Sequence, residues 1–259
     1  MTDHTMYLLS LDCEATGLSK YTDQVTELGL AIYLVRPGPV FEELPHFCTR
    51  VCPTIEISRG AQDVTGLTLA QLVGMPKVKN ALRAMMDHVH AICTQDYERH
   101  LVAYNGIGYD LPLLIAELHR SRENPTDYFR RLRLSSVLDV LVWGKEHLDR
   151  TGLRRRKDGR CSYRLGDVNK AACHRTLEGA HGALADCCAV VEMLKTPLFR
   201  PFCDTVLAPG GCCSGGDFMV NPMTLVRTQM QLIGAREKTK KRNGPTILDF
   251  LARKRTCRA

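Results

Sequence analysis

The sequence predicts an α/β sandwich in which helices flank a mixed β-sheet. The first support is an almost unbroken apolar run over residues 6–12, which is typical of a strand buried on both faces. The second is the alternation of Leu28, Leu30, Ile32 and Leu34 with other residues, which indicates a strand with one strongly apolar face. The third is that strand-like and helix-like apolar patterns alternate along the rest of the chain.

Helical spacing is clearest between residues 77 and 92. The apolar residues Val78, Leu82, Met85 and Val89 recur there at intervals that place them on one side of a helix. The same criteria applied along the chain predict a strand near 47–51, a long loop over 53–68, a helix over 77–92, a strand over 100–104, a helix over 111–118, a strand over 136–143, and helices over 165–173 and 183–194.

The positive charge lies at the C-terminal end. Residues 236–259 hold nine Lys or Arg and two acidic residues, out of 35 and 28 in the 259-residue chain, so the rest of the chain is neutral. This asymmetry is typical of a basic interaction tail. Residues 207–216 are rich in Gly and Cys, which indicates a connector, and a helix is expected over 222–235. We therefore predict a main domain over 1–200, a connector with a helix over 201–235, and a basic C-terminal extension over 236–259.

The composition is that of a folded globular protein, with 44% hydrophobic and 24% charged residues. The chain contains no apolar run near the ~18–20 residues that cross a bilayer, and its N-terminus lacks the pattern of a signal peptide. We expect an intracellular protein, nuclear and/or cytoplasmic, with no membrane partner. The 12 cysteines are expected to be free thiols. Cys48 and Cys52 could form half of a zinc site, but no matching pair follows them.

Two carboxylates stand at the end of the first buried strand. Asp12 and Glu14 are two residues apart, so their side chains point to the same face of a strand. Two carboxylates on one face repel each other unless a cation neutralises them. Oxygen ligands of this kind suit Mg²⁺ or Mn²⁺. Taken alone, the pair also fits a charged strand end that reaches solvent.

Three further candidates lie near the starts of later helices. Asp110 begins the helix that follows the strand over 100–104, where Asp is also a common helix cap. Asp186 lies inside the helix expected over 183–194, although Asp is a poor helix former, and a solvated helix face is its alternative. His181 stands five residues earlier, which places it on the loop entering this helix rather than on the same helix face. A surface histidine is the alternative there.

Three segments carry a resemblance to a known superfamily. They read LLSLDCEATGL over 8–18, LVAYNGIGYDLPLL over 101–114 and LGDVNKAACHRTLEGAHGALADC over 165–187. In this order they resemble the three motifs of the 3′-to-5′ exonucleases that are named for four acidic residues and a histidine (DEDDh, DnaQ-like). The loop PTIEISRGAQDVTGLT over 53–68 also matches, and the resemblance covers about residues 6–200.

A finer likeness points to the three-prime repair exonucleases within this superfamily. DCEATGL, VTELGLAIY, LVAYNGIGYDLPLLIAEL and the Ser-Tyr-x-Leu-Gly pattern of CSYRLGDV carry it. One position departs from the pattern, because relatives usually have His before the Asn of the second motif and this chain has Tyr104. The region after about Arg200 matches nothing in the family.

The resemblance implies a ribonuclease H-like fold and a metal-dependent exonuclease that removes nucleoside 5′-monophosphates from DNA 3′ ends. It implies two Mg²⁺ ions in the two-metal arrangement, with Mn²⁺ as a substitute. Asp12 would bridge both ions, Glu14 and Asp186 would hold the first, and Asp110 would support the second. His181 would take the proton from the attacking water, since the ordinary pKa of histidine, near ~6.5, suits a general base at neutral pH.

The resemblance also implies contacts to the substrate, which would be a single-stranded or frayed DNA 3′ end. Ala15 would offer a backbone contact at the terminal nucleotide, and Tyr109 a hydroxyl at the scissile phosphate. Leu18 and Leu67 would be apolar wedges against the last bases, although both could instead be core leucines.

A run of basic residues falls between the second and third motifs. Arg154, Arg155, Arg156 and Lys157, with Arg160, are expected on a surface loop because such a run is costly to bury. There they would attract phosphates without selecting a sequence. A solvated loop without a role is the alternative.

The tail holds a second candidate for partner binding. Residues 244–251 place Ile247, Phe250 and Leu251 within one turn between basic clusters, which resembles a degenerate sliding-clamp-binding peptide. Those peptides begin with Gln, and Gly244 stands there instead. A nuclear-import signal, or a short helix packed on the protein's own body, are the alternatives.

Other functions stay open at this stage. An RNA 3′-to-5′ exonuclease of the same fold uses the same metal chemistry. A proofreading subunit of a polymerase complex has the same motifs. A catalytically dead nucleic-acid-binding module is disfavoured, because all five candidate positions are present.

Overall fold

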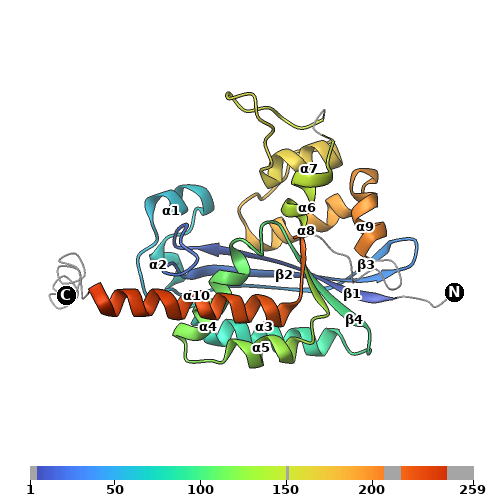
Figure 1. Cartoon of the computed structure of the whole chain (residues 1–259). Helices are drawn as coiled ribbons and strands as arrows, with labels where there is room; N and C mark the ends of the chain where they lie inside the picture. The colour runs from blue at the N-terminus through green and yellow to red at the C-terminus, as the bar shows by residue number, and fades with distance from the viewer. Residues whose placement is uncertain (1–4, 150–151, 207–216, 244–259) are drawn as a thin grey trace.

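A six-stranded mixed sheet with helices on both faces forms the protein (Figure 1). The structure is a computed structural model that describes residues 5–149, 152–206 and 217–243, the last four of these in backbone only. The strand order is β3-β2-β1-β4-β5-β6. β1 pairs with β2, β2 with β3 and β5 with β6 in antiparallel fashion, whereas β1–β4 and β4–β5 are parallel. The predicted α/β sandwich around a mixed sheet is therefore confirmed.

The strands follow the predicted order, with one addition near the C-terminus. The central strand β1 is buried because apolar residues occupy both of its faces: Leu8 packs into one core cluster, and Leu9 and Leu11 into the other. The strands are β1 Met6–Ala15, β2 Val25–Arg36, β3 Val40–Arg50, β4 Glu98–Ala103, β5 Ser136–Asp139 and β6 Met219–Val220.

Each face of the sheet has its own helical layer. In Figure 1, α3, α4, α5 and α10 lie below the sheet, and α6, α7, α8 and α9 lie above it. The helices are α1 Arg59–Thr65, α2 Leu69–Leu72, α3 Val78–Ile92, α4 Asp110–Arg120, α5 Pro125–Leu132, α6 Val140–His147, α7 Leu165–Cys173, α8 Ala183–Leu194, α9 Arg200–Val206 and α10 Pro222–Asn243, with a short 3₁₀ turn at Pro197–Phe199. The predicted helices over 77–92, 165–173 and 183–194 are confirmed. None of the described helices is long and apolar enough to span a bilayer.

Two predictions about local structure are wrong. In both places a helix begins at a capping residue that the apolar pattern does not indicate. The loop expected over 53–68 contains α1, which Ser58 caps at its start and left-handed Gly66 at its end. None of the residues of this helix is buried, so the sequence has no apolar periodicity there that would predict a helix. The strand expected over 136–143 ends at Asp139, whose side chain accepts hydrogen bonds from the backbone N–H groups of Leu141 and Val142. These bonds start α6 in the middle of the apolar run.

The C-terminal region joins the same fold. β6 adds the sixth strand beside β5, and α10 packs against α4 and α5. The helix expected over 222–235 is confirmed and continues to Asn243, so it includes the first residues of the predicted basic extension. The proposed connector at 207–216 and the clamp-like segment at 244–251 lie outside the described residues, and the domain boundaries stay a prediction.

A glycine in β2, which has no side chain, allows α8 to pack closely against the sheet. Gly29 of β2 faces the start of this helix so closely that a Cβ atom there would lie 2.5 Å from the carbonyl carbon of Ala183. Real Cβ atoms do not approach that near, so only glycine allows this contact. Because His181 and Asp186 lie at the start of α8, the close packing at Gly29 also sets their positions relative to β1.

We expect Gly29→Ala to destabilise the protein by roughly 1–3 kcal/mol, the usual effect of overpacking. Urea unfolding measures this change. Gly234→Ala is the matched control, since Gly234 lies in α10 and a Cβ atom added there would meet nothing within 4 Å, and it should be neutral or stabilise by up to ~1 kcal/mol. Equal effects of the two substitutions would contradict the close-contact argument.

Candidate active site

The first two candidate acids lie on the C-terminal half of β1. Asp12 and Glu14 share the face of the strand that α8 covers, the same face on which the Ser10 hydroxyl donates a hydrogen bond to the carbonyl of Cys187 at 2.9 Å. Both side chains are half-buried. Asp12 lies opposite Gly29 in the sheet register, and Glu14 lies opposite Glu27.

Asp110 reaches this strand from the start of α4. Its side chain is 4% exposed, and its Oδ1 accepts a hydrogen bond from the backbone N–H of Cys13 at 3.1 Å. Asp110 is the first residue of α4, after the cap residue Tyr109, and its carboxyl group reaches the backbone of β1. Asp110 is therefore held against the backbone that joins Asp12 to Glu14, although it lies about a hundred residues away in the chain.

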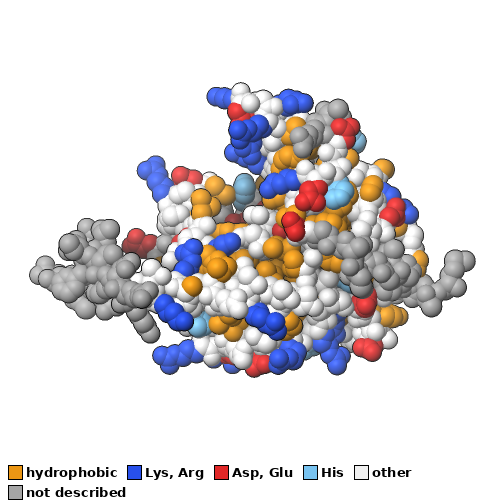
Figure 2. Space-filling model, in the orientation of Figure 1, with side chains coloured by type: hydrophobic (Ala, Val, Ile, Leu, Met, Phe, Trp, Pro, Cys, Tyr) orange, Lys and Arg blue, Asp and Glu red, His pale blue; other side chains and the backbone are white. Residues whose placement is uncertain are grey.

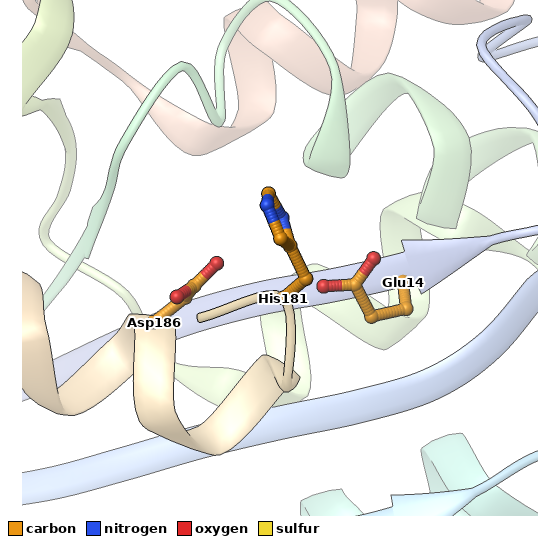
Figure 3. A group of neighbouring side chains, drawn as sticks. All are labelled: Glu14, His181 and Asp186. Atoms are coloured by element: carbon orange, nitrogen blue, oxygen red, sulfur yellow. The ribbon is translucent and has the colours of Figure 1, made fainter. Parts of the chain in front are cut away.

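The remaining two candidates come from the start of α8. His181 lies on the loop that precedes Gly182, the residue before the helix, as expected from its spacing. It is exposed and has a left-handed backbone with φ of 67°. One ligand atom each from Glu14, His181 and Asp186 lie within 4.8 Å of one another. Figure 3 shows the two carboxyl groups facing the space beside the histidine ring.

The four carboxyl groups disfavour one another's ionisation. Burial, together with Asp186, Glu27 and Asp110, raises the pKa of Glu14 to about 8. Burial raises the pKa of Asp110 to about 7, although hydrogen bonds from its own backbone and from Cys13 oppose the rise. Burial and the neighbouring Asp110, Asp186 and Glu14 also place the pKa of Asp12 well above its ordinary value. Without a cation, Glu14 is therefore mostly protonated at neutral pH, and Asp110 is partly protonated.

A divalent cation fits this group of residues. The Oδ1 atom of Asp186 is buried and has no hydrogen-bond partner in the described part of the chain. A buried carboxylate oxygen that lacks a donor is costly unless a cation meets it. The neighbouring donors are carboxylate oxygens, the ligands that hard divalent ions prefer. The structure thus supports a candidate metal site built on Glu14 and Asp186.

Two carboxylates outside the motifs, one half-buried and one fully buried, hold the site in place. The Oε2 of Glu27 accepts a hydrogen bond from the backbone N–H of Ala183 at 2.9 Å, at the start of α8. Asp139 is fully buried and accepts bonds from the N–H groups of Asn105 and Ile107, each at 3.0 Å, in the loop that leads to Asp110. Sequence reasoning missed both residues, because their partners are backbone groups 156 and about 33 positions away.

The predicted substrate contacts have different surroundings. Leu18 is 96% exposed, which excludes the core alternative for this residue. Leu67 is 5% exposed and packs with Ile57 and Leu72, which is the core alternative. Ala15 is buried at the end of β1, and the Tyr109 hydroxyl donates to the carbonyl of Gly17.

The basic run forms a small hairpin. Arg155 bridges to Cys161, Arg156 donates its N–H to the carbonyl of Arg160 at 2.8 Å, and Arg154 lies 3.4 Å from the carboxylate of Asp167. The loop projects at the top of Figure 1, above α7. No described contact joins Arg154, Arg155 or Arg156 to the four candidate acids of the site.

A hollow separates the part of the molecule with α1 from the part with α7. Figure 2 shows a histidine and acidic side chains in this hollow, with Lys and Arg side chains on the hairpin above it and on the surface below it. An acidic floor between basic rims fits a polyanion whose end is held by cations.

Comparison with known sequences identifies the same region. A family model described as "Exonuclease" matches residues 9–194. The chain is 31% identical over 196 residues to human three prime repair exonuclease 2, which covers 68% of this chain and 77% of that protein.

Comparison with solved structures supports the fold. Escherichia coli exonuclease I in complex with a dT13 oligonucleotide matches with a TM-score of 0.59 and 18% identity, over 76% of this chain and 42% of that one. The zinc-bound form of an exonuclease I complex with single-stranded DNA matches with a TM-score of 0.57 and 18% identity, over 77% and 43% of the two chains. This chain therefore spans less than half the length of exonuclease I.

The raised pKa values predict how metal-free stability depends on pH. The folded protein keeps protons on Glu14 and Asp110 that the unfolded chain releases, so the free energy of unfolding should fall as pH rises from about 5 to about 8. Thermal unfolding in chelator measures this fall. Added Mg²⁺ should raise Tm more at pH 8 than at pH 6, because it binds the ionised cluster.

The control for this experiment is Glu14→Gln, which removes one of the titrating groups. The pH dependence of Tm should become shallower, and the Mg²⁺-induced shift should shrink. A steep fall that survives this substitution unchanged would show that other groups cause it.

Proposed function

This chain belongs to the exonuclease family, and from that premise we propose that it removes nucleoside 5′-monophosphates from the 3′ ends of DNA by metal-assisted hydrolysis. The observation that carries the proposal is the convergence of Asp12, Glu14, Asp110 and Asp186, with His181, at one end of β1. This arrangement has four carboxyl groups for cations and one imidazole for a proton. A module that only binds nucleic acid would not require this combination of groups.

The carboxylates would hold the metal, for which we propose two Mg²⁺ ions with Mn²⁺ as a substitute. When bound, such ions neutralise phosphate charge and favour the hydroxide form of a nearby water. By resemblance to the family, Asp12 would serve both ions, with Glu14 and Asp186 on the first and Asp110 on the second. Asp110 and Asp186 reach the site from different helices, so the fold itself brings the ligands together.

His181 is proposed as the general base. It is exposed at the mouth of the site and lies beside two carboxylates, so its ring can meet a water molecule next to the scissile phosphate. The proximity of its ring to Glu14 and Asp186 also supports a second role, as a metal ligand. The two roles differ in their effect on metal affinity.

DNA is the proposed substrate because the relatives point to it. Exonuclease I has structures with DNA oligonucleotides, and the human relative is named a repair exonuclease. Leu18 is proposed as a wedge against the last bases, because it is the most exposed large apolar residue in the described chain. Ala15 is proposed to contact the terminal nucleotide through its backbone, and Tyr109 the scissile phosphate through its hydroxyl. RNA remains the alternative substrate, and action within a polymerase complex the alternative setting.

Further parts of the proposal rest mainly on sequence. Arg154, Arg155 and Arg156 would add phosphate affinity from the hairpin above the hollow. Binding of a sliding clamp through 244–251 rests on the sequence alone, because these residues are outside the described part. The described cysteines are free thiols, which fits a reducing compartment inside the cell.

Asp186→Asn and Asp12→Asn should each reduce turnover by orders of magnitude while the fold persists, because each removes a charge that holds the metal. The measurement is degradation of end-labelled DNA and RNA oligonucleotides, side by side, with Mg²⁺ and with chelator. Circular dichroism serves as the folding control. Near wild-type rates for either variant on every nucleic acid would refute the site assignment.

His181→Ala should lower the rate about 10²–10⁴-fold, the usual contribution of a general base. Mg²⁺ affinity, measured by calorimetry, should barely change. A comparable loss of Mg²⁺ affinity would instead assign His181 to the metal ligands.

A further inference from the structure

A tyrosine beside the site holds two cations on its ring. The guanidinium of Arg236, in α10, lies 4.0 Å from the centroid of the Tyr21 ring, and the ammonium of Lys20 lies 5.6 Å from it. Within the described residues, neither cation forms an ion pair with a carboxylate. The neighbouring acid Glu237 lies 3.1 Å from His119 instead. Two cations without an ion-pair partner among the described residues are thus concentrated on one small surface.

This surface lies on the loop that leaves the acidic cluster. The loop runs from Ala15, at the end of β1, to Val25, at the start of β2, and it carries the exposed Leu18. Lys20 also donates a hydrogen bond at 2.8 Å to the carbonyl of Gly108, two residues before Asp110. The cations are therefore fixed next to the segment that positions one of the candidate metal ligands.

The loop is held in a single conformation. Arg120 of α4 donates to the carbonyls of Tyr21 and Asp23, both at 2.7 Å. The Asp23 carboxylate accepts a bond from the N–H of Ser19, also at 2.7 Å. A Cβ at Gly17 would lie 2.7 Å from the same carboxylate, so glycine is needed for this compact turn. A surface that is ordered before binding loses less entropy when a ligand arrives.

The C-terminal helix completes the surface. The hydroxyl of Tyr21 donates to the side chain of Gln229, which is buried in α10 and 7% exposed. Figure 1 shows that α10 crosses α4 and α5 and ends on the same side of the molecule as α1 and α2. The region that matches nothing in the sequence motifs therefore supplies one of the two cations beside the site.

We propose that Lys20, Tyr21 and Arg236, the Tyr21 platform, bind the phosphates of a single nucleic-acid strand whose 3′ end lies in the acidic cluster. The inference rests on the proposed action on 3′ ends. The cations would contact consecutive phosphates, and the tyrosine ring keeps both side chains in place. The platform selects the charged backbone and not a base, so it serves DNA and RNA strands alike.

The test is binding of a fluorescently labelled single strand by the full chain in chelator, followed by anisotropy over a range of salt. The double variant Lys20→Gln, Arg236→Gln should reduce the slope of log affinity against log salt by about 0.7 for each phosphate that is no longer bound. At about 50 mM salt, the same relation corresponds to roughly an eightfold weaker affinity for each such phosphate. Tyr21→Ala should weaken binding as well, whereas Tyr21→Phe keeps the ring and should retain the affinity.

Arg36→Gln is the matched control. It also removes one exposed cation, but Arg36 is paired with Glu42 at the far end of β2, next to the start of β1. Its salt slope should equal that of the wild type. A double variant with unchanged slope and affinity on both DNA and RNA strands would overturn the platform, and so would a slope change in Arg36→Gln as large as that in the double variant.

The design separates this inference from the proposed reaction. Binding is measured without hydrolysis, so a chain that cuts no DNA yet binds more weakly in the double variant would overturn the reaction and leave the platform standing. A purely structural role for the tyrosine contacts predicts a lower Tm in the double variant with no change in salt slope, and that result would overturn the platform.

Discussion

Repulsion among four carboxyl groups at the end of β1 is the constraint on which the surrounding structure depends. Burial raises the pKa of Asp12, Glu14, Asp110 and Asp186, and neighbouring acids add to the rise for the first three. A folded chain does not collect such groups unless other contacts hold them. The cluster is therefore poised for cations.

The contacts that hold the cluster are made by backbone groups. Asp110 accepts the N–H of Cys13, so the second motif is tied to the first strand. Glu27 accepts the N–H of Ala183 and fixes the start of α8, while Gly29 leaves space for that helix to approach. Two further carboxylates, Glu27 and Asp139, thus stabilise chain segments rather than ligands. Acids of both kinds lie within one region, and Asp110 accepts a backbone N–H although it is also a candidate ligand.

The sequence was sufficient for the parts that depend on local pattern. The apolar periodicity of β1, α3, α7 and α8 predicted where these elements lie in the chain. The motifs predicted that the five candidate residues meet in one site. It was insufficient where capping decided the outcome, because Ser58 and Asp139 start helices that no apolar stripe marks. It also offered no sign of Glu27, whose partner is a backbone group that only the folded chain brings near. Contacts of that range are set by tertiary packing and not by neighbouring residues.

The C-terminal region is joined to the site through the loop after β1. β6 completes the sheet, and α10 then crosses the lower helices to reach Tyr21, whose ring meets Arg236 and whose hydroxyl meets Gln229. Arg120 of α4 donates hydrogen bonds to the backbone carbonyls of Tyr21 and Asp23. Contacts from α4 and α10 thus hold the loop, while its tip, which includes Leu18, stays exposed. A loop with rigid ends and an exposed tip can hold a flexible nucleic-acid strand in one register relative to the fixed cluster of acids.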